Sequence, residues 1–390
     1  MFPIFFFALF GLTSAQQLIN LNRLNGNSDL NIILATGNAS IYITASSDSP
    51  TYLKSIIFST DAVNKTAYEV MSSSRFYRNS DLLQPWIVKG PVTVTTSLTA
   101  QQISALNGSI YITTAKQAYN KYFLVYDITM EQTISTSNAQ SIIVILNSQY
   151  IRQPYMSSYF SSWVQTSNQQ VYMFRGFPAD IAENGDSAIF SNPFPTTLSI
   201  AQTANVENFD VNLPIFYFEV YGGVSFKVST LYVNIGGGAL SHAITTGFYM
   251  KAEISTEVDI QLHPIIEQTS NKIGVNYIGD NILADGTVSV GIRTPDGFSI
   301  ANEFRGSTES YWQTNVGNPL TIKSSGTTGA QFYLQYYTIQ GDAPSTNITT
   351  VTPNGGATTS QPSLTTTRSS RSAHFVLSVM CSFLGYRIML

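Results

Sequence analysis

The feature that most constrains the fold is an almost unbroken succession of short strand-like runs. Apolar and polar residues alternate with a period of two in runs such as 40–44 and 226–234, which is the pattern of half-buried strands. No stretch of a dozen residues repeats with a helical period. The best helical segments are 61–73 and 97–105, where Thr99 begins a Thr-x-x-Gln cap for a single turn. The sequence therefore predicts an all-β protein of antiparallel, jelly-roll-like β-sandwich modules.

Composition favours β-sheet structure and argues against a nucleic-acid partner. Only 11% of residues are charged, against about 25% in ordinary soluble proteins. Aromatic residues make up 12%, a proportion that suits pleated, half-buried surfaces. The net charge of −4 comes with no basic stripe, so we expect no nucleic-acid partner.

Cysteine is almost absent. The single cysteine, Cys381, lies in the apolar segment at the end of the chain. The folded region is therefore expected to have neither a disulfide nor a thiolate metal site. A chain of this length can bury enough apolar surface to fold by packing alone.

The first fifteen residues are expected to be a signal peptide. An apolar run from Phe2 to Leu12 is followed by small residues at Thr13 and Ala15, and it is too short to span a bilayer. No Lys or Arg precedes the run, and the alternative is a buried terminal strand or helix. Cleavage after Ala15 would make Gln16 the first residue of the mature chain.

The C-terminal region has the composition of a stalk and an anchor. Residues 342–372 are rich in Ser and Thr and poor in apolar side chains, which predicts a disordered stalk. Residues 373–390 form an apolar tail. This layout is typical of a GPI-attachment signal, with a plain membrane anchor or an unprocessed secreted tail as the alternatives. The candidate attachment residues are Asn354, Gly355, Ser369 and Ser370.

Four Asn-x-Ser/Thr sequons occur along the chain. In a secreted protein each is a candidate for N-glycosylation and is expected on a surface loop or at a strand end. The four asparagines are Asn38, Asn64, Asn107 and Asn347.

A pattern of proline, Thr-rich strand and aromatic strand recurs three times. Its copies begin at Pro91, Pro195 and Pro319, a spacing close to the length of one β-sandwich. A second repeat, of the form Asn-x-Ser-Ile-Tyr-Ile-Thr, occurs at 38–44 and 107–113, both inside the first expected unit.

The recurrence predicts three tandem sandwich modules. Their expected bounds are 20–132, 136–223 and 224–341. A division into two modules is the competing interpretation, because the repeat can arise by coincidence among many Thr- and Tyr-rich strands.

The Thr-rich and aromatic strand pairs resemble the end of a CUB domain. The residues that carry the resemblance are 90–95 with 121–126, and 318–323 with 331–336. The whole layout is similar to the nematode CUB-like secreted and GPI-anchored proteins. The resemblance implies CUB-like β-sandwiches, an extracellular or membrane-raft location and a role in innate immunity to pathogens. CUB domains usually carry disulfides and often an acidic calcium site, and calcium binding is not carried over to this cysteine-free region.

Few residues point to catalysis. His242 and His263 are the histidines outside the tail, and no Gly-x-Ser-x-Gly elbow is present. Acidic residues gather at 180–186 and 280–286, but neither segment has the spacing of a calcium loop. We predict no catalytic residue, no cofactor and no metal site.

Aromatic residues between 150 and 163 form the most suggestive patch. Flanked by Ser and Gln, they are candidates to stack on sugar rings or to serve as interface hot spots. The alternative is that they belong to the core or to an edge strand. The five residues are Tyr150, Tyr155, Tyr159, Phe160 and Trp163.

The sequence thus favours a non-catalytic surface protein. The expected signal peptide predicts an extracellular location, and the expected stalk and tail predict attachment to the membrane. It is expected to bind a glycan, a protein or a microbial component whose identity is unknown, and to reach the membrane through its tail or a GPI lipid. The alternatives are a structural or coat protein of an epithelial surface and, third, a secreted hydrolase.

Overall fold

The fold is described from a computed structural model. It covers residues 16–27, 31–34, 38–74, 81–137, 140–153, 155–165, 169–178, 188–193, 205–232, 239–241, 245–251, 258–264, 271–279, 287–293, 299–305, 316–325 and 331–340. The chain divides into two compact units, residues 1–345 and 346–390, and all described residues lie in the first. The expected signal peptide, stalk and tail fall outside the described residues.

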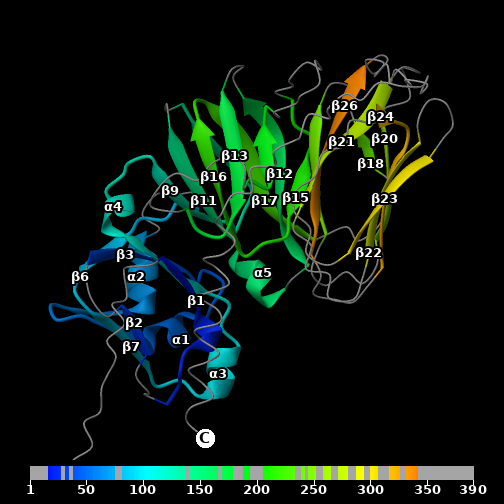
Figure 1. The fold of residues 1–390 in the computed structure, drawn as a ribbon. Coiled ribbons are helices and arrows are strands. Elements are labelled where there is room, and N and C mark those ends of the chain that lie inside the picture. Colours follow the sequence, from blue (N-terminus) through cyan, green and yellow to red (C-terminus); the bar gives the residue numbers. More distant parts are fainter. Residues whose placement is uncertain are drawn as a thin grey trace, which may run out of the picture. The chain divides into compact units, whose positions relative to one another are not determined.

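The described part of the chain is mostly β-strand, which confirms the all-β prediction (Figure 1). The strands form six sheets, here named A to F, and almost every neighbouring pair is antiparallel. The parallel pairs are β9 with β11 and β18 with β20. Short helices connect some of the strands.

Sheets A and B face each other across one apolar core. Ile41 and Ile112 of sheet A pack in the same buried cluster as Phe58 and Val94 of sheet B. In spatial order, sheet A contains β1 (Gln17–Asn20), β8 (Ser109–Thr114), β3 (Asn38–Thr44) and β6 (Trp86–Lys89). Sheet B contains β2 (Asn31–Leu34), β7 (Val92–Thr96), β4 (Ile56–Ser59) and β5 (Asn64–Thr66).

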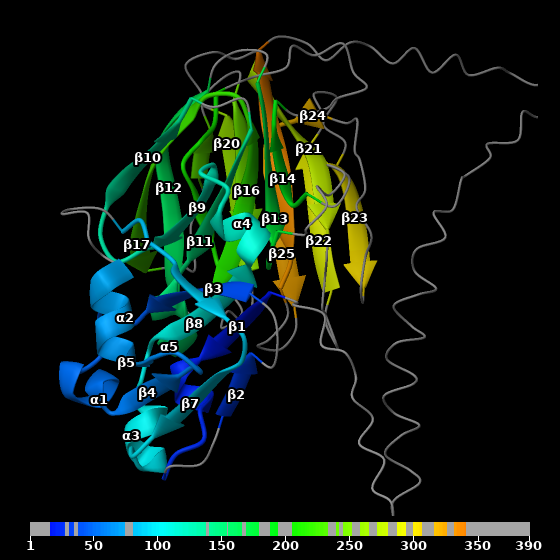
Figure 2. The ribbon, with the colours of Figure 1, turned by 90° about the vertical axis from the view of Figure 1, so that its left-hand side faces the viewer.

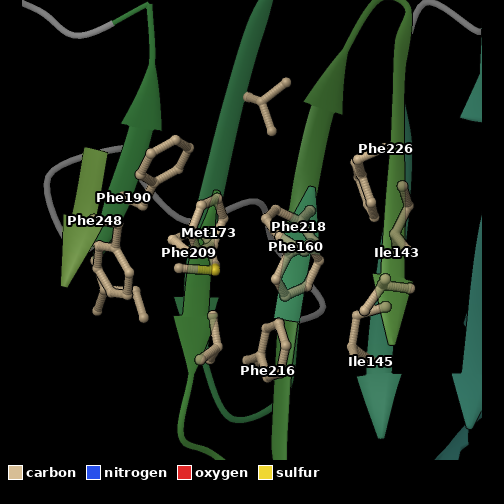
Figure 3. Packing of buried hydrophobic residues seen from close by; sticks show 14 of the residues in the cluster. Ile143, Ile145, Phe160, Met173, Phe190, Phe209, Phe216, Phe218, Phe226 and Phe248 are labelled. Atoms are coloured by element: carbon tan, nitrogen blue, oxygen red, sulfur yellow. The ribbon is translucent and has the colours of Figure 1, made fainter. Parts of the chain in front are cut away.

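Sheets C and D pack face to face around a cluster rich in phenylalanine. Figure 3 shows Phe216 and Phe218 of sheet C against Phe160 and Phe226 of sheet D. Sheet C contains β14 (Phe190–Asn192), β13 (Gln170–Arg175), β16 (Ile215–Tyr221), β11 (Ser141–Leu146) and β9 (Phe123–Asp127). Sheet D contains β10 (Gln132–Thr136), β17 (Val224–Tyr232), β12 (Met156–Gln165) and β15 (Phe209–Val211).

Sheets E and F form a third facing pair. Leu334 of sheet E shares a buried cluster with Val290 and Ile322 of sheet F. Sheet E contains β19 (Thr246–Met250), β26 (Tyr333–Gln340), β21 (Asn271–Gly279) and β24 (Val316–Gly317). Sheet F contains β18 (Ala239–Ser241), β20 (Val258–Pro264), β25 (Leu320–Ser325), β22 (Thr287–Arg293) and β23 (Ser299–Arg305).

Sheet C is buried on both faces. One face carries Ile143 and Phe218 into the core shared with sheet D. The other carries Val144 and Tyr217 into a second cluster that also holds Tyr42 of sheet A. This explains why β16 reads as a continuous apolar run rather than an alternating one.

The repeated Ile-Tyr-Ile motif pairs with itself. β3 and β8 run antiparallel, so Ile41, Tyr42 and Ile43 lie opposite Ile112, Tyr111 and Ile110. The isoleucines enter the core between sheets A and B. The two tyrosine rings stack on the other face with centroids 5.9 Å apart, and burial raises the pKa of both phenols.

The helices lie mainly beside sheets A and B (Figure 2). The expected Thr99 cap is confirmed, because Thr99 Oγ1 accepts from Gln102 N and Thr99 N donates to Gln102 Oε1. In the 61–73 segment only the second half is helical, since residues 64–66 form β5. The helices are η1 (Leu21–Arg23), α1 (Pro50–Lys54), α2 (Ala67–Ser74), α3 (Ala100–Ser104), α4 (Ala115–Ala118) and α5 (Ser148–Arg152).

Strand pairing crosses both expected module boundaries. β9 falls within 20–132 but pairs with β11, and β17 falls within 224–341 but pairs with β10 and β12. The aromatic strands of the first two repeat copies, β9 and β16, lie in the same sheet, so the copies do not occupy equivalent places. Pro195 lies outside the described residues. The number of independent modules stays a prediction.

A buried carboxylate fastens the segment before β6 to the turn after β9. Asp81 is 2% exposed. Its carboxylate accepts hydrogen bonds from Thr129 N at 2.9 Å, Thr129 Oγ1 at 2.6 Å, Met130 N at 3.1 Å and Gln132 Nε2 at 3.1 Å. Removing this one acceptor would leave several donors without a partner.

Asp81→Ala is therefore expected to lower the free energy of unfolding by about 3 kcal/mol, since each buried donor left unpaired costs about 1–3 kcal/mol. Urea unfolding followed by tryptophan fluorescence measures the loss. Asp259→Ala, which removes an exposed carboxylate paired with Lys323, should change the free energy by less than about 1 kcal/mol. Equal effects of the two substitutions would contradict this role for Asp81.

Candidate functional site: the outer face of sheet D

The structure divides the predicted aromatic patch between core and surface. Phe160 and Tyr150 are 1% and 5% exposed, so neither can face a ligand, which corrects the expectation for these two residues. Tyr155 and Tyr159 are half-buried. Trp163 is also partly exposed, but its ring packs against the core between sheets C and D.

A β-bulge accounts for the placement of Trp163. The register between β12 and β17 shifts between Ser161 and Val164, and Ser162 has a φ of +53°. One extra residue reverses the alternation. Trp163 therefore turns inward and stacks on Phe226 at 5.1 Å, while Val164 turns outward.

Tyr159 stays on the outer face of sheet D. It lies opposite Ser229 of β17 on one side and opposite Asp210 of β15 on the other. Its neighbour Phe160 points the opposite way and stacks on Phe209 at 5.0 Å. The pleat therefore separates a phenylalanine core from a polar surface.

Polar side chains dominate this surface, which we call the D face. Its register follows from the pairing of β10 and β12 with β17 and of β12 with β15. Its described members are Thr133, Ser135, Tyr159, Ser161, Val164, Asp210, Ser225, Lys227, Ser229 and Leu231. Ser157 shares this register but is fully buried.

The D face carries little net charge. Lys227 Nζ lies 3.3 Å from Glu131 Oε1, and both side chains are well exposed. Asp210 accepts a hydrogen bond from Ser157 Oγ at 2.8 Å. Burial raises the pKa of the Asp210 carboxyl above its usual value of 3.8, against an opposing effect of the Ser157 hydrogen bond.

The arrangement combines one aromatic ring with a row of hydroxyl groups. Hydroxyls both donate and accept hydrogen bonds, and a carboxylate accepts them. A tyrosine ring offers a flat apolar surface with a polar tip. Together, these groups match a ligand that has apolar C–H faces bordered by hydroxyls.

The described sequons differ in their surroundings. Asn38 and Asn64 are exposed at the first residues of β3 and β5. Asn107 is only 8% exposed, and Asn107 N and Gly108 N each donate to the Asp48 carboxylate at 2.7 Å. The expectation of a surface position is therefore wrong for Asn107.

The remaining candidates lie outside the described residues. These are Asn347, the attachment residues Asn354, Gly355, Ser369 and Ser370, both acidic segments and His242. His263 belongs to β20, where its backbone pairs with Leu240. Within the described ranges, no group of three or more His, Cys, Asp or Glu residues is placed to hold a metal ion.

Sequence reasoning missed Asp210 and Ser229. Both lie far along the chain from Tyr159, and only strand pairing brings them together. A signal was present in β17, where Ser225, Lys227 and Ser229 alternate with buried apolar residues.

The comparisons with known proteins cover different shares of the chain. The family model described as "Glycoprotein: Transmembrane glycoprotein" matches residues 36–384. A search of curated proteins finds no match. One similar solved structure is the "CUB1-EGF-CUB2 domain of HUMAN MASP-1/3", with 10% identity over 54% of this chain and 100% of that one. Its TM-score is 0.18, so the likeness carries no argument about this chain.

One further finding bears on the membrane. No helix among the described residues is both long enough and apolar enough to cross a bilayer.

Asp210→Asn should stabilise the protein by an amount that grows as the pH rises from 4 to 7. Since folding raises the pKa of this carboxyl, the folded state binds the proton more tightly than the unfolded one. The wild type therefore loses stability as pH rises from the unfolded pKa through the folded one, and the neutral amide avoids this loss.

Unfolding free energies of both proteins at several pH values test this expectation. Asp259→Asn serves as the control, because its carboxylate is exposed and should differ from the wild type by less than about 1 kcal/mol at each pH. A constant difference between wild type and Asp210→Asn across the range would contradict the assignment.

Proposed function

The chain belongs to the transmembrane glycoprotein family, and we propose that it is a non-enzymatic surface protein whose D face binds carbohydrate. Family membership, established over residues 36–384, supports a surface or membrane location. The choice of ligand rests on the D face itself. The observation that carries it is the half-exposed Tyr159 between Ser229 and Asp210.

The chemistry of the D face favours a neutral sugar over an ionic ligand. Lys227 is already paired with Glu131, and Asp210 already accepts from Ser157. The hydroxyls of Ser161 and Ser229 flank the Tyr159 ring through their strand positions. A pyranose ring can stack on the tyrosine while its own hydroxyls bond to these serines.

Features at the chain ends support a tethered form of this protein. We include in the proposal that the stalk at 342–372 holds the sheets away from the membrane and that the tail at 373–390 provides the attachment. The similarity to nematode CUB-like proteins adds a role in recognising microbial surfaces. That role rests on the short motifs at 90–95, 121–126, 318–323 and 331–336.

Tyr159→Ala should reduce binding to a recognised glycan by about tenfold or more, because truncating an aromatic hot-spot residue costs about 2 kcal/mol or more and about 1.4 kcal/mol corresponds to tenfold in affinity. A panel of immobilised glycans and microbial polysaccharides, probed with the purified protein, identifies the ligand and measures its affinity. Tyr119→Ala is the matched control, since Tyr119 is 70% exposed and lies outside the D face. Unchanged affinity of Tyr159→Ala, or no binding to any member of the panel, would remove the proposal.

Deletion of residues 373–390 should convert the protein from a membrane-associated to a freely secreted form. The reason is that these residues supply the apolar segment at the chain end. Fractionation of expressing cells and medium measures the change. Treatment of cells bearing the full chain with phosphatidylinositol-specific phospholipase then distinguishes the anchors, because release indicates a GPI lipid and retention a spanning tail. Secretion of the full chain into the medium would contradict the tether.

A further inference from the structure

The edges of sheets A and B lie on one side of their shared core. β6 is the last strand of sheet A beyond β3, and β5 is the last strand of sheet B beyond β4. Trp86 of β6 packs edge-on against Phe58 of β4 at 6.1 Å, and Lys65 Nζ of β5 lies 5.2 Å from the Trp86 ring centroid. We call the two strands together the β5–β6 edge.

The β5–β6 edge combines open backbone with exposed apolar side chains. Among the described residues, no strand pairs with the outer side of β5 or β6. Ile57, Val63 and Ile87, which lie on or beside these strands, are 39%, 43% and 38% exposed. An exposed apolar strand edge is a template for pairing with another chain, and natural proteins usually cover or charge it. Here each strand carries a single lysine, Lys65 in β5 and Lys89 in β6, beside the exposed apolar side chains.

Each exposed sequon lies diagonally beside one of the exposed isoleucines. Asn38 is opposite Lys89 and Ser40 is opposite Ile87, so Asn38 and Ile87 share the outer face of sheet A. Asn64 is opposite Ser59 and Thr66 is opposite Ile57, so Asn64 and Ile57 share the outer face of sheet B. Diagonal neighbours on one face of a sheet are about 7–8 Å apart.

From this placement we propose that N-glycans on Asn38 and Asn64 shield the β5–β6 edge and prevent it from pairing with a second copy of the chain. N-glycans are bulky and solubilising, and one attached at each asparagine would extend over the neighbouring isoleucine. The proposal rests on the proposed function, because only a chain that enters the secretory pathway receives these glycans.

The buried sequon at Asn107 contrasts with the two exposed sequons at Asn38 and Asn64. It lies two residues before β8, which occupies the interior of sheet A between β1 and β3. A Cβ added to Gly108 would lie only 2.6 Å from Ala45 Cβ and 2.7 Å from Thr44 O, so this segment has no room for a bulky attachment. We expect glycans on Asn38 and Asn64 but not on Asn107.

The test uses the full chain expressed in a eukaryotic secretory host and purified in detergent. Mass spectrometry of its glycopeptides should find Asn38 and Asn64 modified and Asn107 unmodified. In the double variant Asn38→Gln/Asn64→Gln, the protein mass per solubilised particle, measured by light scattering with the detergent and glycan contributions subtracted, should at least double, since the smallest closed association is a dimer. Enzymatic removal of glycans from the folded wild type should give the same increase, which separates shielding from any effect on folding.

A charge placed on the β5–β6 edge distinguishes pairing of strand edges from non-specific hydrophobic association. Adding Ile87→Lys to the double variant should restore the original particle mass. Val164→Lys, which charges an apolar residue that is 66% exposed on β12, should not restore it. An unglycosylated, folded double variant of unchanged mass, or equal rescue by both lysines, would overturn the proposal.

The absence of glycan from every sequon would instead contradict the proposed surface location. Conversely, glycans present on both asparagines with no effect of their removal would leave the surface location intact and refute only the shielding.

Discussion

The structure depends on the burial of sheet C on both of its faces. Phe216 and Phe218 of β16 pack toward sheet D, while Ile215 and Tyr217 pack toward sheet A. Burying one such side chain contributes about 1.5–3 kcal/mol, which is close to the contribution of a typical disulfide. A cluster of many phenylalanines thus takes the place of the cross-links that small extracellular domains often use. Phe248 and Tyr333 of sheet E join the same cluster.

Much of the fold class could be predicted from local patterns, whereas strand partners could not. Period-two alternation identified strands throughout, and the Thr99 cap was recognisable because its chemistry is confined to four neighbouring residues. The parallel pairing of β9 with β11 depends instead on which apolar faces meet in space. For that reason the Pro91 pattern, which ends in β9, could not show where one sandwich ends and the next begins.

The candidate site was predictable only in part, for a related reason. Tyr159 was identified with its four aromatic neighbours, but alternation alone could not separate it from Phe160 in the core or anticipate the bulge at Ser162. Asp210 could be recognised as a member of the site only from the register between β12 and β15, which places it opposite Tyr159. The burial of Asn107 likewise follows from contacts with Asp48, which is distant in the sequence.

The pairing of the two Ile-Tyr-Ile segments also decides between alternative alignments of β3 and β8. A slip of two residues would keep isoleucine opposite isoleucine for part of the inner face, because side chains repeat every second residue. On the outer face each segment has a single tyrosine, and such a slip would separate Tyr42 from Tyr111 and place each ring opposite a serine or a threonine. The stacked tyrosines therefore select one alignment among those that hydrophobic burial alone would accept.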